Sequence, residues 1–350
     1  MKILHLNFDL GTKVEKNSHG GIENFIYNLH NALLKRGYDS DVLARYDSKV
    51  DRLIVFNGNY TEDPNIETGE DFLGAADFRY CADFLQHVHD NNYDIIHSHA
   101  RPLSVFSEFV NKPIVTTLHL PVNWFWYKEL GDINHHENKF VAVSNSQIEP
   151  YSKEGIVVNR VIYNGVPVKE NHPFSETHGD YLLYLGRMSK GKGPHIAIDV
   201  AKKLDMPLKI AGGYSSTSET TFFNEFIKPR IGDKIEYLGH VGECKEELYM
   251  NAKCLLFPSI LEESFGLVPV EAGMTGTPTI CFSIGATPEI IIDNTTGFLI
   301  ENVGDVDAMC EAVSKIEKID RNFCRKNMID RFSLDSMVSN YIDLYEEILR

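Results

Sequence analysis

The sequence has few of the features that mark secreted or membrane-spanning proteins. Its six cysteines are scattered without CxxC spacing, which favours reduced, buried thiols in a cytoplasmic protein. The apolar run Ile3–Phe8 is too short for the core of a signal peptide. No apolar run reaches the length that spans a bilayer. We therefore expect a cytoplasmic location.

Positive charge is also in short supply. Lys and Arg number 34 against 50 Asp and Glu, a formal net charge of −16, and both halves of the chain are acidic. Such a field repels nucleic acid and anionic lipid surfaces. We expect a small-molecule partner and no nucleic acid. Contact with a membrane is disfavoured but remains an alternative, and the oligomeric state stays open.

The composition is that of a globular protein with two α/β domains. Of the 350 residues 43% are hydrophobic and 24% charged, and the chain is longer than one core usually supports. Short β-rich runs alternate with helical patterns, which predicts parallel sheets built from βαβ units. We expect domains at residues 1–167 and 180–333, joined by the turn-rich stretch Pro167–Gly179, and a terminal helix at 334–350.

The predicted elements of the first half follow this rhythm. The expected strands are Ile3–Phe8, Asp41–Ala44, Leu53–Phe56, Asp94–His97, Pro113–Leu118, Lys139–Val143 and Arg160–Tyr163, with helices at Gly21–Arg36 and near Asp71–Asp90. A second series begins at Tyr181–Leu185 and includes a helix around Glu219–Ile227. Ligands of doubly wound sheets bind outside the carboxyl ends of the strands, so the loops after strands are the places to look for chemistry.

Two adjacent glycines, Gly20 and Gly21, end the loop after the first predicted strand. Glycines let backbone N–H groups at a helix N-terminus approach a phosphate, and the helix dipole adds attraction. A tight turn that requires positive φ is an equal alternative. The G-x-G-x-x-G fingerprint is absent, which argues against a nicotinamide dinucleotide.

The loop Gly186–Gly193 follows the first strand of the second half and superficially fits a P-loop. Gly193 stands where a Ser or Thr would hold Mg²⁺, so an ATPase is disfavoured. Arg187 and Lys192 are better interpreted as two cations for a diphosphate. Solvated surface charge is the alternative.

The segment Phe257–Gly273 contains two carboxylates, Glu263 before a predicted helix and Glu271 inside it. A carboxylate can accept two hydrogen bonds from a vicinal diol, so one of them can bind a sugar and the other a ribose. The intervening amides at the helix start suit a phosphate. Helix capping plus a solvated helix face is the alternative, made less convincing by the apolar surroundings.

These motifs together resemble the family 4 retaining glycosyltransferases of the GT-B fold, in which two Rossmann-like doubly wound parallel-sheet domains face each other across a cleft. The resemblance covers nearly the whole chain, and its two most specific parts are Gly186-Arg187 with Lys192-Gly193 and the spacing Glu263-x7-Glu271. The other matching motifs are Gly20-Gly21 with Glu23, Asp94–His99, Thr117–His119, Val143-Ser144 and Asn164–Val166.

The resemblance implies retaining transfer from a UDP- or GDP-linked sugar to a hydroxyl of a carbohydrate or glycoconjugate, with no metal and no cofactor besides the donor. Arg187 and Lys192 would stabilise the departing diphosphate, Glu263 would contact the sugar, and Glu271 would bind the ribose. The terminal helix would cross back onto the first domain. Further donor contacts are implied at Gly20, Gly21, His240, Val241, Ser264, Phe265, Gly266 and Leu267.

Several histidines gather in the first half. His119 follows the strand Pro113–Leu118 and matches the family histidine near the transferred sugar, so the resemblance makes it catalytic. We interpret His97 as structural and place His99 beside the acceptor. His135 and His136 are adjacent and would point apart if extended, so the spacing does not predict a metal site.

Both tryptophans, Trp124 and Trp126, follow His119 closely. Aromatic faces stack on sugars, so we expect them at the acceptor, with core packing or a membrane contact as alternatives. Two rival functions remain at this point. One is a GT-B phosphorylase or epimerase, and the other is a catalytically silent nucleotide-sugar-binding subunit.

Overall fold

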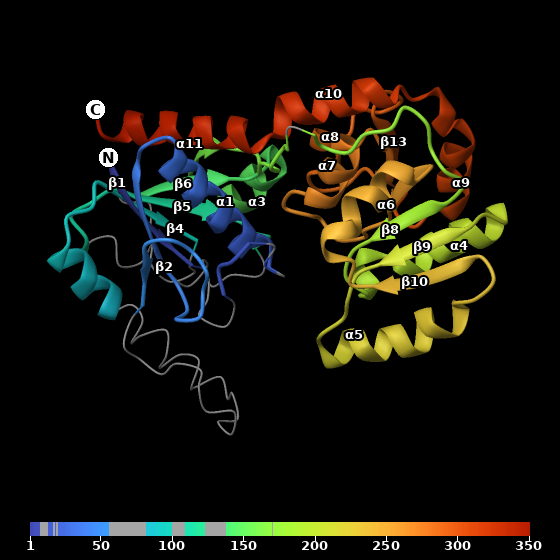
Figure 1. Cartoon of the computed structure of the whole chain (residues 1–350), viewed down its shortest axis with the longest axis horizontal. Helices are drawn as coiled ribbons and strands as arrows, with labels where there is room; N and C mark the ends of the chain where they lie inside the picture. Colours follow the sequence, from blue (N-terminus) through green and yellow to red (C-terminus); the bar gives the residue numbers. More distant parts are fainter. Residues whose placement is uncertain are drawn as a thin grey trace. The chain divides into compact units, whose positions relative to one another are not determined.

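The computed structural model folds the chain into two compact units (Figure 1). It describes residues 1–7, 13–16, 18, 20–55, 82–99, 109–122, 138–169 and 171–350. Unit 1 comprises Met1–Gly165 together with Leu334–Arg350, and unit 2 comprises Val166–Ser333. The chain therefore passes between the units twice.

Unit 1 is built on a seven-stranded parallel sheet in the order β3-β2-β1-β4-β5-β6-β7. Because β1 pairs with β2 on one side and β4 on the other, the strand order reverses between β1 and β4, which is the switch point where ligands of such sheets bind. The strands are β1 (Lys2–Leu6), β2 (Asp39–Leu43), β3 (Leu53–Ile54), β4 (Ile95–Ser98), β5 (Ile114–Leu118), β6 (Asn138–Ala142) and β7 (Val158–Val161).

Alternate residues of a strand point to opposite faces of the sheet, and in unit 1 helices cover both faces. Helices α1 (Gly21–Lys35) and α11 (Leu334–Ile348) share one buried core with Ile3 and Val115, and Figure 1 shows α11 running alongside α1. The helical residues 82–90 pack against Leu4 on the other face. The short helix α3 (Ile148–Lys153) buries Tyr151 there against β5 and β6.

Unit 2 repeats the design with six parallel strands in the order β10-β9-β8-β11-β12-β13. Its strand order reverses between β8 and β11, which pair directly. The strands are β8 (Leu182–Leu185), β9 (Leu208–Ala211), β10 (Ile235–Gly239), β11 (Cys254–Phe257), β12 (Thr279–Phe282) and β13 (Gly297–Ile300).

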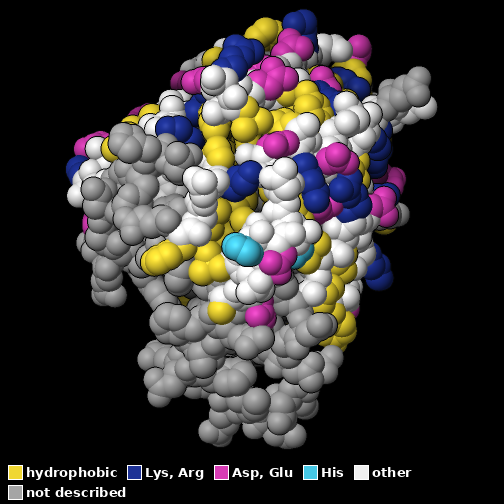
Figure 2. Space-filling model, turned by 90° about the vertical axis from the view of Figure 1, so that its left-hand side faces the viewer, with side chains coloured by type: hydrophobic (Ala, Val, Ile, Leu, Met, Phe, Trp, Pro, Cys, Tyr) yellow, Lys and Arg dark blue, Asp and Glu magenta, His cyan; other side chains and the backbone are white. Residues whose placement is uncertain are grey.

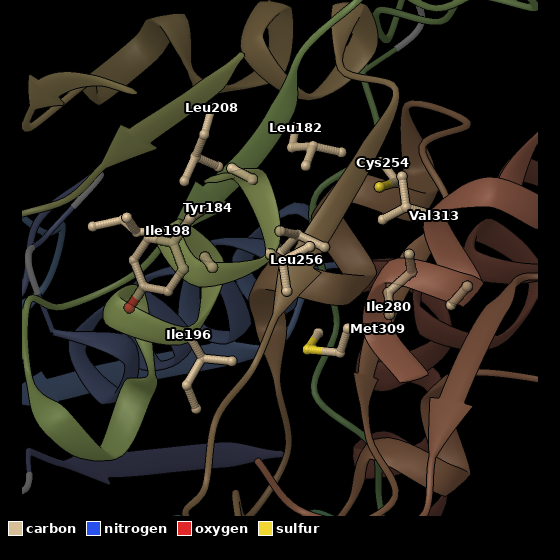
Figure 3. Close-up of a cluster of buried hydrophobic side chains, with 14 of the residues drawn as sticks. Leu182, Tyr184, Ile196, Ile198, Leu208, Cys254, Leu256, Ile280, Met309 and Val313 are labelled. Atoms are coloured by element: carbon tan, nitrogen blue, oxygen red, sulfur yellow. The ribbon is translucent and has the colours of Figure 1, made fainter. Parts of the chain in front are cut away.

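Helices also cover the unit 2 sheet. They are α4 (Pro194–Leu204), α5 (Thr217–Phe222), α6 (Lys245–Asn251), α7 (Leu267–Met274), α8 (Thr287–Ile290), α9 (Val306–Lys315) and α10 (Arg321–Phe332). Figure 3 shows the core on one face, where Tyr184 and Leu256 from the strands meet Met309 of α9. Strand residues that face the opposite way, such as Leu255, are buried too. Both faces of the sheet are therefore covered.

The doubly wound α/β class and the parallel sheets predicted from the sequence are confirmed. The helix expected around Glu219–Ile227 is instead α5 followed by a π-helical turn, Phe223–Ile227. Of the helix expected near Asp71–Asp90, residues 71–81 lie outside the described part of the chain, and 82–90 are helical.

The described surface mixes charges of both signs. On the face shown in Figure 2, lysine and arginine side chains lie interspersed with aspartate and glutamate. Within the described residues, no helix combines the length and the hydrophobicity needed to cross a bilayer.

Candidate active site

Two loops of unit 2 meet at the switch point of its sheet, one after β8 and the other after β11. The amide of Ile260 donates a hydrogen bond to the carbonyl of Gly191 at 2.8 Å. Gly193 has φ +75°, and a Cβ there would lie 2.1 Å from the carbonyl oxygen of Pro258. The glycines of the first loop thus allow the second loop to approach closely.

The contact between these loops brings Lys192 and Glu263 together. Lys192 Nζ lies 2.5 Å from Glu263 Oε1, and the Ser259 hydroxyl donates to the same oxygen at 2.8 Å. The two charged side chains are only 21% and 17% exposed. The pair is largely buried, and each charge offsets part of the desolvation cost of the other. Two residues that are far apart in sequence therefore form one polar site.

The helix that follows Glu263 begins without a side-chain cap. Gly266 has φ +132° and precedes α7 without a side-chain cap, so the first amides of α7 have no capping side chain. The Ser264 hydroxyl is buried and has no hydrogen-bond partner in the described part of the chain. Phe265 is buried and packs edge-on against Phe332. Residues 264–267 thus place polar groups beside the Lys192–Glu263 pair.

Arg187 lies in the loop after β8 but pairs elsewhere. Its guanidinium lies 3.2 Å from Glu219 Oε1, and its side chain is 61% exposed. Burial raises the pKa of Glu219, but backbone hydrogen bonds from Ser215 and Ser216 and the charge of Arg187 outweigh burial and lower it overall. Glu219 is thus an anion held by backbone hydrogen bonds that pairs with the largely exposed Arg187 side chain.

Glu271 is held by two residues of α6. Lys245 Nζ lies 2.6 Å from Glu271 Oε1, and the Tyr249 hydroxyl donates to Oε2 at 3.1 Å. Burial, followed by the nearby Glu271 charge, raises the pKa of Tyr249 well above its usual value. The carboxylate therefore has both oxygens engaged but remains partly exposed.

Four of these partners were not predicted from the sequence: Ser259, Glu219, Lys245 and Tyr249. Only Glu219 carries a local signal, because Ser216-x-x-Glu219 is a capping box that the structure forms. The others contact their partners through tertiary packing.

The predicted base-binding residues lie at the edge of the same sheet. His240 and Val241 follow β10, the terminal strand, and His240 is exposed. Because all strands of the sheet are parallel, their carboxyl ends share one edge with the loops after β8 and β11.

In unit 1, Gly20 and Gly21 begin α1 next to the end of β1. The turn with positive φ considered for this pair is wrong, since Gly20 has φ −89° and Gly21 is helical. A Cβ at Gly20 would lie 1.6 Å from a carboxylate oxygen of Glu23, so a larger residue there would displace the end of the Glu23 side chain.

A buried cluster of histidines and hydroxyls occupies the carboxyl ends of β4 and β5. His99 Nδ1 and His119 Nε2 lie 2.9 Å apart. His97 bonds the Thr117 hydroxyl at 2.7 Å and the Tyr345 hydroxyl of α11 at 2.6 Å. The interpretation of His97 as structural agrees with these contacts.

The imidazoles of this cluster are neutral at neutral pH. Burial lowers the pKa of His119 to about 3 and those of His5, His97 and His99 well below their usual value. Nitrogens of His5, His97 and His99 lie within 4.8 Å of one another. Both nitrogens of His97 are already hydrogen-bonded, which leaves two histidines with an unpaired nitrogen. Zinc sites use at least three protein ligands, so this set does not fit one.

The remaining predicted residues, Trp124, Trp126, His135 and His136, lie outside the described part of the chain.

Comparison with known proteins points to one family. The sequence profile described as "Glycosyl transferases group 1" matches residues 168–331, and the profile described as "Glycosyltransferase Family 4" matches residues 19–170. O-antigen chain mannosyltransferase C of Escherichia coli is 23% identical over 95% of either chain. Glycogen synthase of Mycobacterium tuberculosis is 26% identical over 79% of this chain and 78% of its own.

Solved structures share the fold. The Anabaena protein HepE, in complex with UDP and glucose, superposes with a TM-score of 0.77 at 18% identity and 99% coverage of both chains. Sucrose-phosphate synthase from Thermosynechococcus elongatus gives a TM-score of 0.78 at 19% identity, again with 99% coverage of both chains.

Proposed function

The chain belongs to the family 4 glycosyltransferases of the GT-B fold and is a glycosyltransferase, and on that premise we propose a retaining enzyme that uses a nucleotide diphosphate sugar. The acceptor is a hydroxyl of a carbohydrate or glycoconjugate. The observation that carries the proposal is the convergence of Lys192 and Glu263 at the switch point of the unit 2 sheet.

In this proposal the unit 2 loops hold the donor. Lys192 and Arg187 stabilise the negative charge that grows on the diphosphate as the glycosidic bond breaks. Glu263 accepts hydrogen bonds from the transferred sugar, and Glu271 binds the ribose diol. The Ser264 hydroxyl, which has no hydrogen-bond partner among the described residues, and the first amides of α7, which no side chain caps, support a phosphate or sugar site here.

The reaction we propose is front-face transfer. The sugar gains oxocarbenium character, the departing phosphate is stabilised by Lys192 and Arg187, and a phosphate oxygen takes the proton of the attacking acceptor hydroxyl. The new glycosidic bond forms on the face that the phosphate leaves, so the anomeric configuration is retained. Because the two side-chain cations supply the positive charge, we propose that no metal is required.

A UDP-linked donor is the first choice. HepE from Anabaena has been solved with UDP, with UDP-glucose, and with UDP and glucose. A GDP-linked sugar is the second choice. We further propose a cytoplasmic location, which suits the free thiols of Cys244, Cys254, Cys281, Cys310 and Cys324.

The test begins with thermal unfolding in the presence of a panel of UDP- and GDP-sugars, since a ligand that binds the native state raises its apparent stability. The stabilising donor is then incubated with carbohydrate acceptors, with and without EDTA, and the product's anomeric configuration is read by NMR. We expect transfer with retention that EDTA does not affect. Binding without transfer or donor hydrolysis would favour a silent subunit, and an inverted product would overturn the mechanism.

A further inference from the structure

The hydrogen bond between His99 and His119 constrains the protons of both rings. His99 Nδ1 lies 2.9 Å from His119 Nε2, so one of these nitrogens donates and the other accepts. A neutral imidazole carries one N–H and one bare nitrogen. Fixing the donor of this bond therefore fixes the tautomer of both residues.

The surroundings of His99 decide which nitrogen donates. Its other nitrogen, Nε2, is buried and has no hydrogen-bond partner among the described residues. If His119 donated, the proton of His99 would sit on Nε2 as a buried N–H without an acceptor, which costs about 1–3 kcal/mol. If His99 donates from Nδ1, only a lone pair is left unpaired, and orphaned acceptors are tolerated better than orphaned donors.

Packing holds both rings in this arrangement. The ring of His99 stacks on His5 with centroids 5.9 Å apart and lies 4.2 Å from that of His97. Phe25 of α1 packs edge-on against His119, with centroids 4.8 Å apart. The hydrogen bond is thus formed between two rings that have little freedom to turn.

Both rings are in the neutral form to which this argument applies. Burial lowers the pKa of His119 to about 3 and that of His99 well below its usual value. Near neutral pH each ring therefore carries a single proton.

We propose that His99 is a positioning residue that holds His119 in the tautomer protonated at Nδ1, so that His119 presents a hydrogen-bond donor to an oxygen of the bound sugar. This inference rests on the proposed place of His119 beside the transferred sugar. His119 can then donate a hydrogen bond from Nδ1 to an oxygen of the sugar, but Nδ1 cannot accept the proton of the acceptor hydroxyl. This tautomer therefore excludes His119 as a general base that acts through Nδ1.

The direct test is NMR of the full-length protein labelled with ¹⁵N-histidine, in which two-bond correlations identify the protonated nitrogen of each neutral ring. The signals of His119 and His99 are assigned from their disappearance in His119→Gln and His99→Asn. We expect Nδ1 protonation in both rings. Protonation of His119 at Nε2, or rapid averaging between the two forms, would overturn the inference. This readout needs neither donor nor activity, so it stands or falls separately from the proposed reaction.

A kinetic test uses a pair of His99 variants. In His99→Asn the side-chain amide can still donate near the position of Nδ1, whereas His99→Leu has no donor. We expect His99→Leu to lower kcat about tenfold with little change in the donor KM, and His99→Asn to recover most of that loss. Equal kcat in the two variants would contradict the positioning role. If wild type transfers no sugar at all, the proposed function fails while the NMR result still decides the tautomer.

Discussion

The two units carry different kinds of chemistry at the carboxyl ends of their parallel strands. At the switch point of unit 2, Lys192 and Glu263 form an ion pair that stays partly exposed. At the carboxyl ends of β4 and β5 in unit 1, His97, His99 and His119 form neutral hydrogen bonds. Burial lowers the pKa values of these three histidines, so the second group is uncharged at neutral pH. The strand ends of the two sheets thus hold an ion pair in one unit and neutral imidazoles in the other.

Acid should affect the two units differently, and this is the largest effect we expect. Unfolded histidines bind protons as pH falls below about 6.5, but buried His5, His97 and His99 do not, because burial holds their pKa values well below the usual value. Above pH 6.5 these histidines therefore do not lower the unfolding free energy of unit 1. It falls by up to about 1.4 kcal/mol per histidine per pH unit below it.

Hydrogen exchange at pH 7 and pH 5, read peptide by peptide, measures this difference. Unit 1 should lose several kcal/mol of protection, a large share of the 5–15 kcal/mol typical of a domain. Unit 2 should lose less, because His172 is the buried histidine among its described residues. An equal loss of hydrogen-exchange protection in both units would contradict the predicted difference in acid sensitivity.

Replacing Lys192 by Ala should have the next largest effect. Loss of a cation that acts on transition-state charge should lower kcat about 10²- to 10³-fold while the thermal midpoint changes little. Lys190→Ala is the matched control, since this exposed lysine lies in the same loop. Steady-state kinetics of the two variants decides the matter, and similar turnover in both would remove the assigned role of Lys192.

Glu271→Ala should act chiefly on nucleotide binding. Losing charge-assisted hydrogen bonds to a ribose diol is worth about 1.5–3 kcal/mol, so the Kd for the nucleotide should rise about ten- to a hundredfold. Titration calorimetry measures it, with Glu247→Ala on the neighbouring helix as the control because Glu247 is exposed. An unchanged Kd would count against ribose binding by Glu271.

Tyr345→Phe tests the neutral network of unit 1 and should have the smallest effect. It leaves Nδ1 of His97 without its 2.6 Å partner, at a cost of about 1–3 kcal/mol in unfolding free energy. Urea unfolding followed by far-UV circular dichroism measures the change, with the exposed Tyr46→Phe as control. Equal stability of the two variants would show that the hydroxyl of Tyr345 contributes nothing.

The sequence predicts the fold better than it predicts the site. Periodicity places the strands because buried parallel strands and amphipathic helices have distinct patterns, and β1 and α1 fall where they were expected. Motif spacing also identifies Lys192 and Glu263, which the structure brings together.

The partners of the site residues were harder to predict. Lys245 reaches Glu271 from another helix, and Tyr345 reaches His97 from an element 248 positions along the chain. Such contacts have no local pattern, because they depend on how distant elements pack. The contact of Gly20 was likewise hard to predict, since it comes from the way the Glu23 side chain folds back over it.

The return of the chain to unit 1 at Leu334 has a consequence for synthesis on the ribosome. The sheet of unit 1 is made before unit 2, but α11, which supplies Tyr341 and Tyr345 to its core, is made after unit 2. Unit 2 is continuous in sequence and can close as soon as Ser333 has emerged. The nascent chain therefore carries an incomplete first unit, with an uncovered apolar face, throughout the translation of the second.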